Sequence, residues 1–155
     1  MEKYQPNISV CIQLISNEQV LLMRRLNTGY QDGKYEYPSG HIEKGESLID
    51  AAVRETREEV GIEINANDLE FVGCVDNHTS GKHVNFLFRT STFLGTPIIM
   101  EPNDCDDLMW VRLTDLSPNM EELSVDTKRF VDMVNSNCVL KSYTGEENFS
   151  KVKGL

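Results

Sequence analysis

The sequence has few cysteines, no long apolar run and no excess of positive charge. Its four cysteines, Cys11, Cys74, Cys105 and Cys138, lie far apart and form no C-x-x-C pair. This spacing argues against a zinc finger or a disulfide framework, so we expect reduced, mostly buried thiols. No apolar run approaches the roughly 18 residues of a membrane helix, and the first residues do not have the pattern of a secretory signal. We therefore expect a cytoplasmic protein with no membrane partner.

Basic residues are scarce. The chain has 15 lysines and arginines against 25 acidic residues, which gives a formal net charge of −10. Such a charge opposes binding to a phosphate backbone unless the basic residues are clustered, so we expect no nucleic-acid partner. An acidic protein that handles phosphates usually needs a cation between itself and its ligand, and this points to a metal.

The chain of 155 residues is the length of one ordinary domain. We expect a single domain over residues 1–141 and a polar, poorly ordered C-terminal tail over residues 142–155. The chain has no internal repeat and no low-complexity segment. Residue patterns predict strands at residues 8–15, 20–26, 70–76, 84–93 and 109–113, and helices at residues 47–60 and 125–135. Strands interrupted by two helices indicate a mixed α/β (α+β) fold.

Acidic residues concentrate in the first predicted helix. Glu55, Glu58 and Glu59 stand at positions i, i+3 and i+4, which places them on one helix face with their Cβ atoms about 5–6 Å apart. An exposed, solvated face is the ordinary interpretation of such a cluster. However, like charges at this spacing repel, and they lie in the last turns, where the helix dipole already disfavours negative charge. A divalent cation would reverse both penalties, so a metal site is the second interpretation.

The segment GHIEKGESLIDAAVRETREEVGI, which begins at Gly40, contains this cluster. It resembles the Nudix box, the loop–helix–loop signature of the MutT-like Nudix hydrolases. The match rests on eight fixed positions, Gly40, Glu46, Arg54, Glu55, Glu58, Glu59, Gly61 and Ile62. The one departure is Thr56, where the family usually has an aliphatic residue and where threonine can still turn its methyl group inward. The resemblance implies a Nudix-type α/β/α sandwich with a mixed β-sheet.

The resemblance also implies a metal site. It assigns Glu55, Glu58 and Glu59 as ligands of Mg²⁺, for which Mn²⁺ can substitute. Similar proteins carry a further acidic ligand downstream of the box, where Glu101 is the first choice and Asp104 the second. The plainer interpretation of Glu101 is an exposed loop acid, because loop acids are commonly solvated.

Catalytic roles follow from the same resemblance. Glu58 or Glu55 would accept the proton of the attacking water, and the choice between them stays open. Glu46 and Arg54 would pair to orient the helix and its ligands. Gly40 and Gly61 would permit backbone turns that a side chain obstructs.

Candidate substrate-binding residues lie mainly around the second strand and the start of the box. Only one of Arg24 and Arg25 can face the site, because neighbouring residues of a strand point to opposite sides. Two exposed charges are the plainer interpretation of this pair. The other candidates, each of which has an alternative role in the core or on the surface, are Tyr30, Tyr35, Tyr37, Gly40, His41, His78, His83 and Trp110.

These features predict a Mg²⁺-dependent hydrolase of a nucleoside diphosphate linked to another moiety. The small-molecule substrate would be a nucleoside triphosphate, an oxidised nucleotide or a nucleotide conjugate, and water would attack phosphorus to cleave a phosphoanhydride bond. Removal of RNA caps is disfavoured by the acidic charge. The alternative is a non-catalytic nucleotide-binding module that acts as a sensor or partner surface. A homodimer is a further option, but no residue pattern locates its interface.

Overall fold

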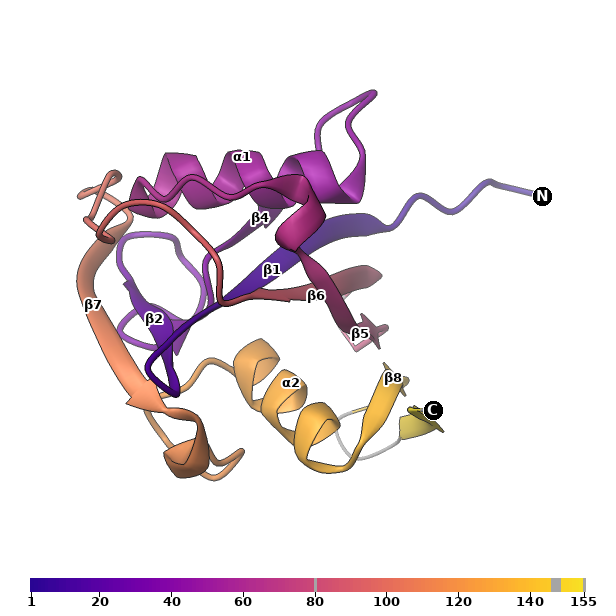
Figure 1. Cartoon of the computed structure of the whole chain (residues 1–155). Coiled ribbons are helices and arrows are strands. Elements are labelled where there is room, and N and C mark those ends of the chain that lie inside the picture. The colour runs from indigo at the N-terminus through magenta and orange to yellow at the C-terminus, as the bar shows by residue number, and fades with distance from the viewer. Residues whose placement is uncertain (80, 146–148, 155) are drawn as a thin grey trace.

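Strands lie between two helices in the computed structural model, which describes residues 1–79, 81–145 and 149–154. Helix α1 (Leu48–Val60) covers one side of the strands and α2 (Val125–Asn135) the other (Figure 1). The strands are β1 (Asn7–Ser16), β2 (Gln19–Arg25), β3 (Tyr35–Glu36), β4 (Ser39–His41), β5 (Glu70–Asn77), β6 (His83–Thr90), β7 (Cys105–Arg112), β8 (Cys138–Tyr143) and β9 (Phe149–Lys153). Two short 3-10 helices, η1 (Ala66–Asp68) and η2 (Leu113–Asp115), complete the described elements. The predicted α/β/α sandwich is confirmed.

Strand β1 organises the sheet. It pairs in parallel with β6 and antiparallel with both β2 and β4, so the predicted mixed sheet is also confirmed. The remaining order runs β6–β5–β8–β9 on one side and β2–β3 on the other, with β7 paired to β2. The β1–β4 register places Gly40 opposite Val10. Through this pairing the start of the box is fixed to the centre of the sheet.

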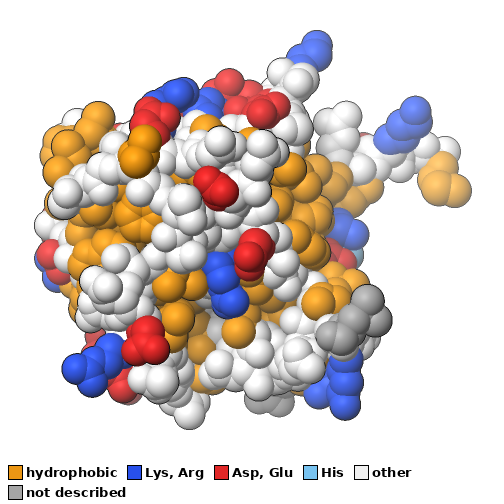
Figure 2. Space-filling view, viewed as in Figure 1, with side chains coloured by type: hydrophobic (Ala, Val, Ile, Leu, Met, Phe, Trp, Pro, Cys, Tyr) orange, Lys and Arg blue, Asp and Glu red, His pale blue; other side chains and the backbone are white. Residues whose placement is uncertain are grey.

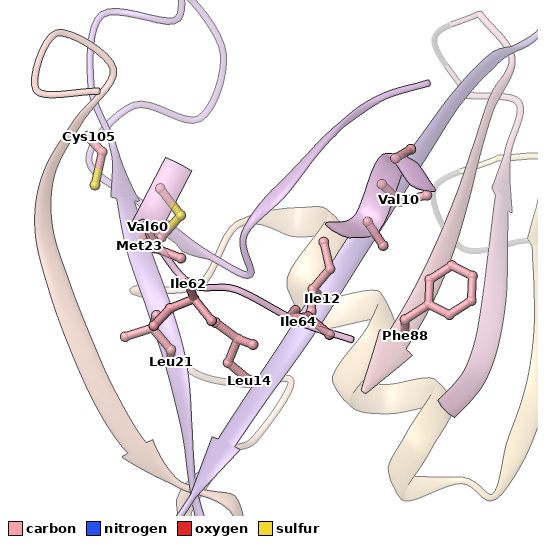
Figure 3. Close-up of a cluster of buried hydrophobic side chains, with 12 residues drawn as sticks. Val10, Ile12, Leu14, Leu21, Met23, Val60, Ile62, Ile64, Phe88 and Cys105 are labelled. Atoms are coloured by element: carbon pink, nitrogen blue, oxygen red, sulfur yellow. The ribbon is translucent and has the colours of Figure 1, made fainter. Parts of the chain in front are cut away.

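The core divides into two parts because both faces of β1 are covered by a helix. Ile12 and Leu14 face the α1 side, whereas the alternate residue Cys11 belongs to the cluster on the α2 side. Figure 3 shows Leu14, Leu21 and Ile62 pointing toward one another, and all three are fully buried. The α1-side core therefore fixes the helix that carries the acidic cluster.

Helix α1 begins and ends where its sequence predicts. The Ser47 side chain caps the start by accepting a hydrogen bond from the Asp50 backbone N–H. Gly61 ends the helix in the left-handed conformation, with φ of 70°. Thr56 is fully buried, and its hydroxyl donates to the Ala52 carbonyl over 2.8 Å. The hydroxyl of Thr56, which stands where an aliphatic residue is usual, therefore has a hydrogen-bond partner inside the core.

The C-terminal segment differs from expectation. Residues 142–155 were expected to be a poorly ordered tail, but β8 runs on to Tyr143 and β9 pairs antiparallel with it. The predicted domain end at residue 141 thus falls inside a strand. Strand β9 has the short sequence FSKVK and is exposed along its length. Its residues therefore lack the alternation of buried and exposed side chains from which a strand is predicted. Residues 146–148 and 155 of this segment lie outside the described residues.

The described surface carries both charge signs and an apolar area. In Figure 2 apolar side chains gather on the left part of the face shown, over the end of α1 and the connection into β7. The exposed apolar residues of that connection are Leu94, Ile98 and Met100. Within the described ranges, no helix is both long and apolar enough to cross a membrane.

Candidate active site

Gly40 allows α1 to lie very close to β4. A Cβ atom at Gly40 would lie 2.0 Å from Cδ of Glu55 and 2.1 Å from its Oε1 atom. The space that a side chain would occupy is thus filled by the Glu55 carboxylate. The prediction that Gly40 permits a turn is wrong, because this glycine lies within strand β4, outside the left-handed conformations. The same prediction holds for Gly61, the left-handed C-cap of α1.

Arg54 is the centre of the acidic cluster. Its guanidinium binds Glu46 in two places, with Nε donating to Oε1 over 2.7 Å and Nη2 to Oε2 over 3.0 Å. Its Nη1 donates to Glu55 over 2.7 Å and to Glu58 over 3.1 Å. A second bond from Nη2 reaches the His41 carbonyl over 3.0 Å. Bidentate, charge-assisted pairs are strong and directional, so Arg54 ties the loop, the strand and the helix together.

Glu46 is adapted to its ionised state. Two hydrogen bonds from Arg54 and one from the Glu43 backbone N–H lower the pKa of Glu46 to about 2. The structure thus brings together the predicted pair Glu46 and Arg54. Glu46 contacts Arg54, and Arg54 in turn contacts Glu55 and Glu58, so the contacts of the pair are those of positioning residues.

Glu59 is buried beside other acids. Its Oε2 accepts a hydrogen bond of 2.9 Å from the Ser39 backbone N–H. Burial raises the pKa of Glu59 well above its ordinary value, and the nearby carboxylates of Glu55, Glu36 and Glu101 raise it further. A buried carboxylate is costly without a positive partner. Glu59 is therefore a group that a bound cation would stabilise.

Glu101 lies in the same site although it is distant in sequence. Its backbone carbonyl accepts from the N–H groups of Asp104 and Cys105, both over 3.0 Å, which forms the turn before β7. Burial raises the pKa of Glu101, with smaller contributions from Asp104 and Glu58. The backbone N–H of Met100 donates to the Glu59 carbonyl over 3.1 Å, so the predicted fourth acid lies at the end of α1. Asp104, the second choice, lines the same cleft.

The donor set fits a divalent cation, although the side chains are not gathered around one point. Among the residues with described positions, no three acidic, histidine or cysteine side chains converge as a ready metal site. The reason is that Arg54 lies between Glu55 and Glu58 and binds both. Carboxylate oxygens are the ligands that Mg²⁺ prefers, and buried Glu59 has no cationic partner within ion-pair distance in the described structure. The Mg²⁺ site stays a prediction that these residues are suited to fulfil.

A cleft of about 570 Å³ opens beside the cluster. This volume lies in the range of small-ligand sites, which is roughly 300–1,000 Å³. Its lining combines box residues and the downstream acids with polar and aromatic side chains from β5, β6 and α2. The predicted site residues that line the cleft are Arg24, Arg25, Tyr30, Tyr37, Gly40, His41, Glu59, His83, Glu101 and Asp104. The expectation that only one of the two arginines faces the site is therefore wrong.

The predicted substrate-binding side chains take different positions. Arg24 reaches the cleft but is held by Asp106, with Nε and Oδ1 separated by 2.7 Å. Tyr37 is 1% exposed, and its hydroxyl accepts from Gln13 over 3.0 Å, so it is mainly a core residue. Tyr30 is 51% exposed at the rim of the cleft. Of the predicted aromatics, Tyr30 is therefore the one best placed to contact a ligand ring.

Of the remaining candidates from the sequence, all but His83 have their contacts outside the cleft. Trp110 packs against the α1-side core, and the Tyr35 hydroxyl bonds to the Asp107 carboxylate. His78 pairs with Asp76, with Nε2 and Oδ1 3.1 Å apart, and lies outside the cleft. His83 does line the cleft, at the start of β6.

Three polar residues of the cleft wall were missed from the sequence. Asn77 and Asn85 are almost fully buried, at 6% and 8% exposure, and Asp126 lies in the first turn of α2. Burial raises the pKa of Asp126, although Arg129, His83 and Arg25 act in the opposite direction. The available signal was an asparagine that interrupts the apolar residues of a predicted strand, as Asn85 does in VNFLF.

Comparison with known proteins identifies the family. The family model described as NUDIX domain matches residues 3–134, and the chain belongs to this family. A relative named NAD-capped RNA hydrolase NudC, from Pseudomonas putida strain GB-1, is 30% identical over 110 residues, which are 71% of this chain. The match covers 38% of that relative, so the chain spans well under half the length of this curated protein.

Solved structures support the fold. The MutT NUDIX hydrolase from Burkholderia pseudomallei has a TM-score of 0.74 and 24% identity, covering 84% of this chain and 98% of that protein. The NUDIX domain of Shewanella oneidensis NrtR, solved as a complex with ADP ribose, has a TM-score of 0.68 and 19% identity. That match covers 86% of this chain and 89% of the NrtR domain.

Proposed function

We propose that this NUDIX protein is a Mg²⁺-dependent hydrolase that cleaves a phosphoanhydride bond in a nucleoside diphosphate linked to another moiety. The observation that carries the proposal is the arrangement around Arg54. This side chain holds Glu46, Glu55 and Glu58 together and binds the carbonyl of His41, which lines a cleft large enough for a nucleotide. A surface used only for solubility does not need so many directional bonds from one arginine to its acidic residues.

The metal would be held by carboxylates of α1, namely Glu55, Glu58 and Glu59, with Glu101 from the loop before β7. A divalent cation held there would supply positive charge that offsets the phosphates, and it would lower the pKa of a water bound to it. Glu58 or Glu55 accepts the proton of that water. The water oxygen forms a bond to phosphorus, the bridging P–O bond breaks, and the leaving phosphate takes its electron pair.

Glu46 and Arg54 position these groups. To bind a cation, Glu55 and Glu58 would have to give up some of their contact with Arg54 and contact the cation instead. The bidentate bond to Glu46 keeps the guanidinium in place during this exchange. The neighbouring carboxylates are thereby held close enough to act together.

The substrate class is a nucleotide, and two comparisons favour a conjugate within it. NAD, which appears in the name of the Pseudomonas relative, and ADP-ribose, which is bound to the Shewanella domain, both contain adenosine diphosphate joined to ribose. Arg24, Tyr37, Gly40 and His41 remain the proposed residues around the phosphates and the ring, together with half-exposed Tyr30. Nucleoside triphosphates, including oxidised ones, are the other members of the class.

The test is a substrate panel in the presence of Mg²⁺. Purified protein is incubated with nucleoside triphosphates, oxidised nucleotides, ADP-ribose, NAD and dinucleoside polyphosphates, and the products are separated by chromatography. Glu58→Gln is the inactivating variant. Glu70→Gln, an exposed residue at the start of β5, is the matched control because it removes the same charge away from the cleft.

We expect one group of compounds to be cleaved by the native protein and by Glu70→Gln, but not by Glu58→Gln. If no compound is cleaved while a nucleotide still raises the melting temperature, the chain is a binding module instead. A Glu58→Gln variant with full activity would refute the assignment of the cluster as the catalytic site.

A further inference from the structure

A second hollow adjoins the cleft. It has a volume of about 780 Å³ and shares two lining residues, Tyr30 and Asn77, with the cleft. Its other walls come from α2 and from the end of β8. The two spaces therefore meet at Tyr30 and Asn77, and together they exceed what one nucleotide fills.

The second hollow is lined by positively charged side chains, although the overall charge of the protein is −10. Lys128 and Arg129, consecutive residues of α2, both line it. Among the described residues, no carboxylate lies within ion-pair distance of either side chain, and the guanidinium of Arg129 stacks on the Tyr143 ring with a centroid distance of 4.2 Å. The stack leaves the N–H groups at the guanidinium edge free to donate.

Asp132, the acid among the described residues that line this hollow, is paired with the buried ammonium of Lys141. Asp76, on the adjacent strand β5, lies 3.8 Å from the ammonium of Lys82, measured from Oδ1 to Nζ. Lys128 and Arg129 thus give the hollow a local positive charge that the composition of the chain does not suggest.

The charge of Arg129 also acts on the cleft itself. It lowers the pKa of Asp126 and that of Tyr30, although burial keeps both above their ordinary values. Both residues line the cleft. A ligand that runs past Tyr30 from the acidic cluster would therefore move from carboxylates toward the positive charges of Lys128 and Arg129.

We propose that the second hollow binds a further phosphate group that the nucleotide conjugate carries outside its diphosphate, so that phosphate-bearing nucleotide conjugates are preferred over unphosphorylated ones. This inference rests on the proposed function and adds a substrate feature to it. The phosphate would accept hydrogen bonds from Lys128 and the edge of Arg129, while Tyr30 contacts the ring that connects the two spaces. The same chemistry is offered by a phosphorylated dinucleotide and by the first phosphate of a short RNA carrying a nucleotide cap.

The experiment compares NAD with NADP, which differ by one phosphate, and adds a short NAD-capped RNA. Binding is measured by calorimetry and, separately, cleavage by KM and kcat, each at low and at raised salt. The variants are Lys128→Gln and the double variant Lys128→Gln/Arg129→Gln. Lys153→Gln, on the exposed strand β9, is the matched control for the loss of one positive charge.

The native protein should bind NADP more tightly than NAD, and it should cleave NADP with a lower KM. Charge-assisted hydrogen bonds are strong enough that the double variant should lose about tenfold in affinity for NADP. In the single variant Lys128→Gln, kcat and KM for NAD should stay unchanged, as should both ligands' parameters in Lys153→Gln. The preference should also weaken with salt, because the cations are partly exposed.

The outcomes separate the two proposals. Equal binding of NAD and NADP by the native protein, or an undiminished preference in the double variant, would overturn the second phosphate site whether or not hydrolysis occurs. Absence of hydrolysis with a retained, Lys128-dependent preference in calorimetry would reject the hydrolase and keep the site. Preference for the capped RNA without preference for NADP would assign the hollow to a nucleic-acid phosphate instead of a small conjugate.

Discussion

Replacement of Gly40 by alanine tests how closely β4 and α1 must approach. The new Cβ atom would lie 2.0 Å from Glu55 Cδ, whereas non-bonded carbon atoms normally stay about 3.5 Å or more apart. The Glu55 carboxylate must therefore retreat by about 1.5 Å, the difference between these two distances. Functional groups need placement within about 0.5 Å, and a misplacement near 1 Å lowers rates by about a hundredfold. We expect kcat to fall by about that factor.

Stability should also fall in this variant, by no more than one charged hydrogen bond contributes. Movement of Glu55 weakens its 2.7 Å hydrogen bond to Arg54. A charged hydrogen bond contributes about 1.5–3 kcal/mol, and the loss of stability should not exceed this. Alanine also restricts the unfolded chain and so offsets part of this loss, by about 0.4–1 kcal/mol.

The assay measures kcat with Mg²⁺ on the substrate found in the panel, together with the melting temperature. Gly154→Ala, near the C-terminal end and away from the cleft, is the control for a general glycine effect. A Gly40→Ala variant that is folded and fully active would refute the reasoning, because the position of Glu55 would then not matter to the reaction.

Three further predictions concern stability. Because Arg54 lowers the pKa of Glu46 to about 2, ionised Glu46 stabilises the fold fully above the ordinary carboxyl pKa and loses this effect as the pH falls toward 2. The melting-temperature difference between the native protein and Glu46→Gln should therefore shrink over that range, and a constant difference would contradict the pairing. Burial raises the pKa of Asp126, so its ionised form destabilises the fold at neutral pH. Asp126→Asn should raise the melting temperature at pH 7, with the gain disappearing as the pH falls below the ordinary carboxyl range; a loss at pH 7 would show a missing partner. Leu14→Ala removes a fully buried side chain of the α1-side core and should cost about 2–5 kcal/mol in the free energy of unfolding, measured by urea titration.

Local sequence patterns predicted the box well because its chemistry lies within one helix and its caps. The spacing of Glu55, Glu58 and Glu59 follows from helix geometry, and Ser47 and Gly61 are common cap residues. The distance between Gly40 and Glu55 depends on how a strand packs on a helix. No local pattern encodes that distance, so the reason for a glycine at this position was misread.

The part of the cleft wall that comes from β6 and α2 was harder to predict for the same reason. Asn85 and Asp126 come from β6 and α2, which are separated by about forty residues and meet only in the folded chain. Tyr37 was predicted at the substrate, but the packing of its ring under α2 makes it largely a core residue. Aromatic residues serve both purposes, and burial decides between them.

The measurement that tests the central claim most directly is hydrolysis of NAD in water enriched in oxygen-18, with Mg²⁺ present. Water attack on phosphorus predicts that the label appears in a phosphate group of one product. It also predicts that cleavage stops when the metal is chelated or Glu58 is replaced by glutamine. Label found on a sugar carbon, or cleavage that continues without a divalent metal, would contradict the proposal that this carboxylate cluster serves a metal-dependent attack on phosphorus.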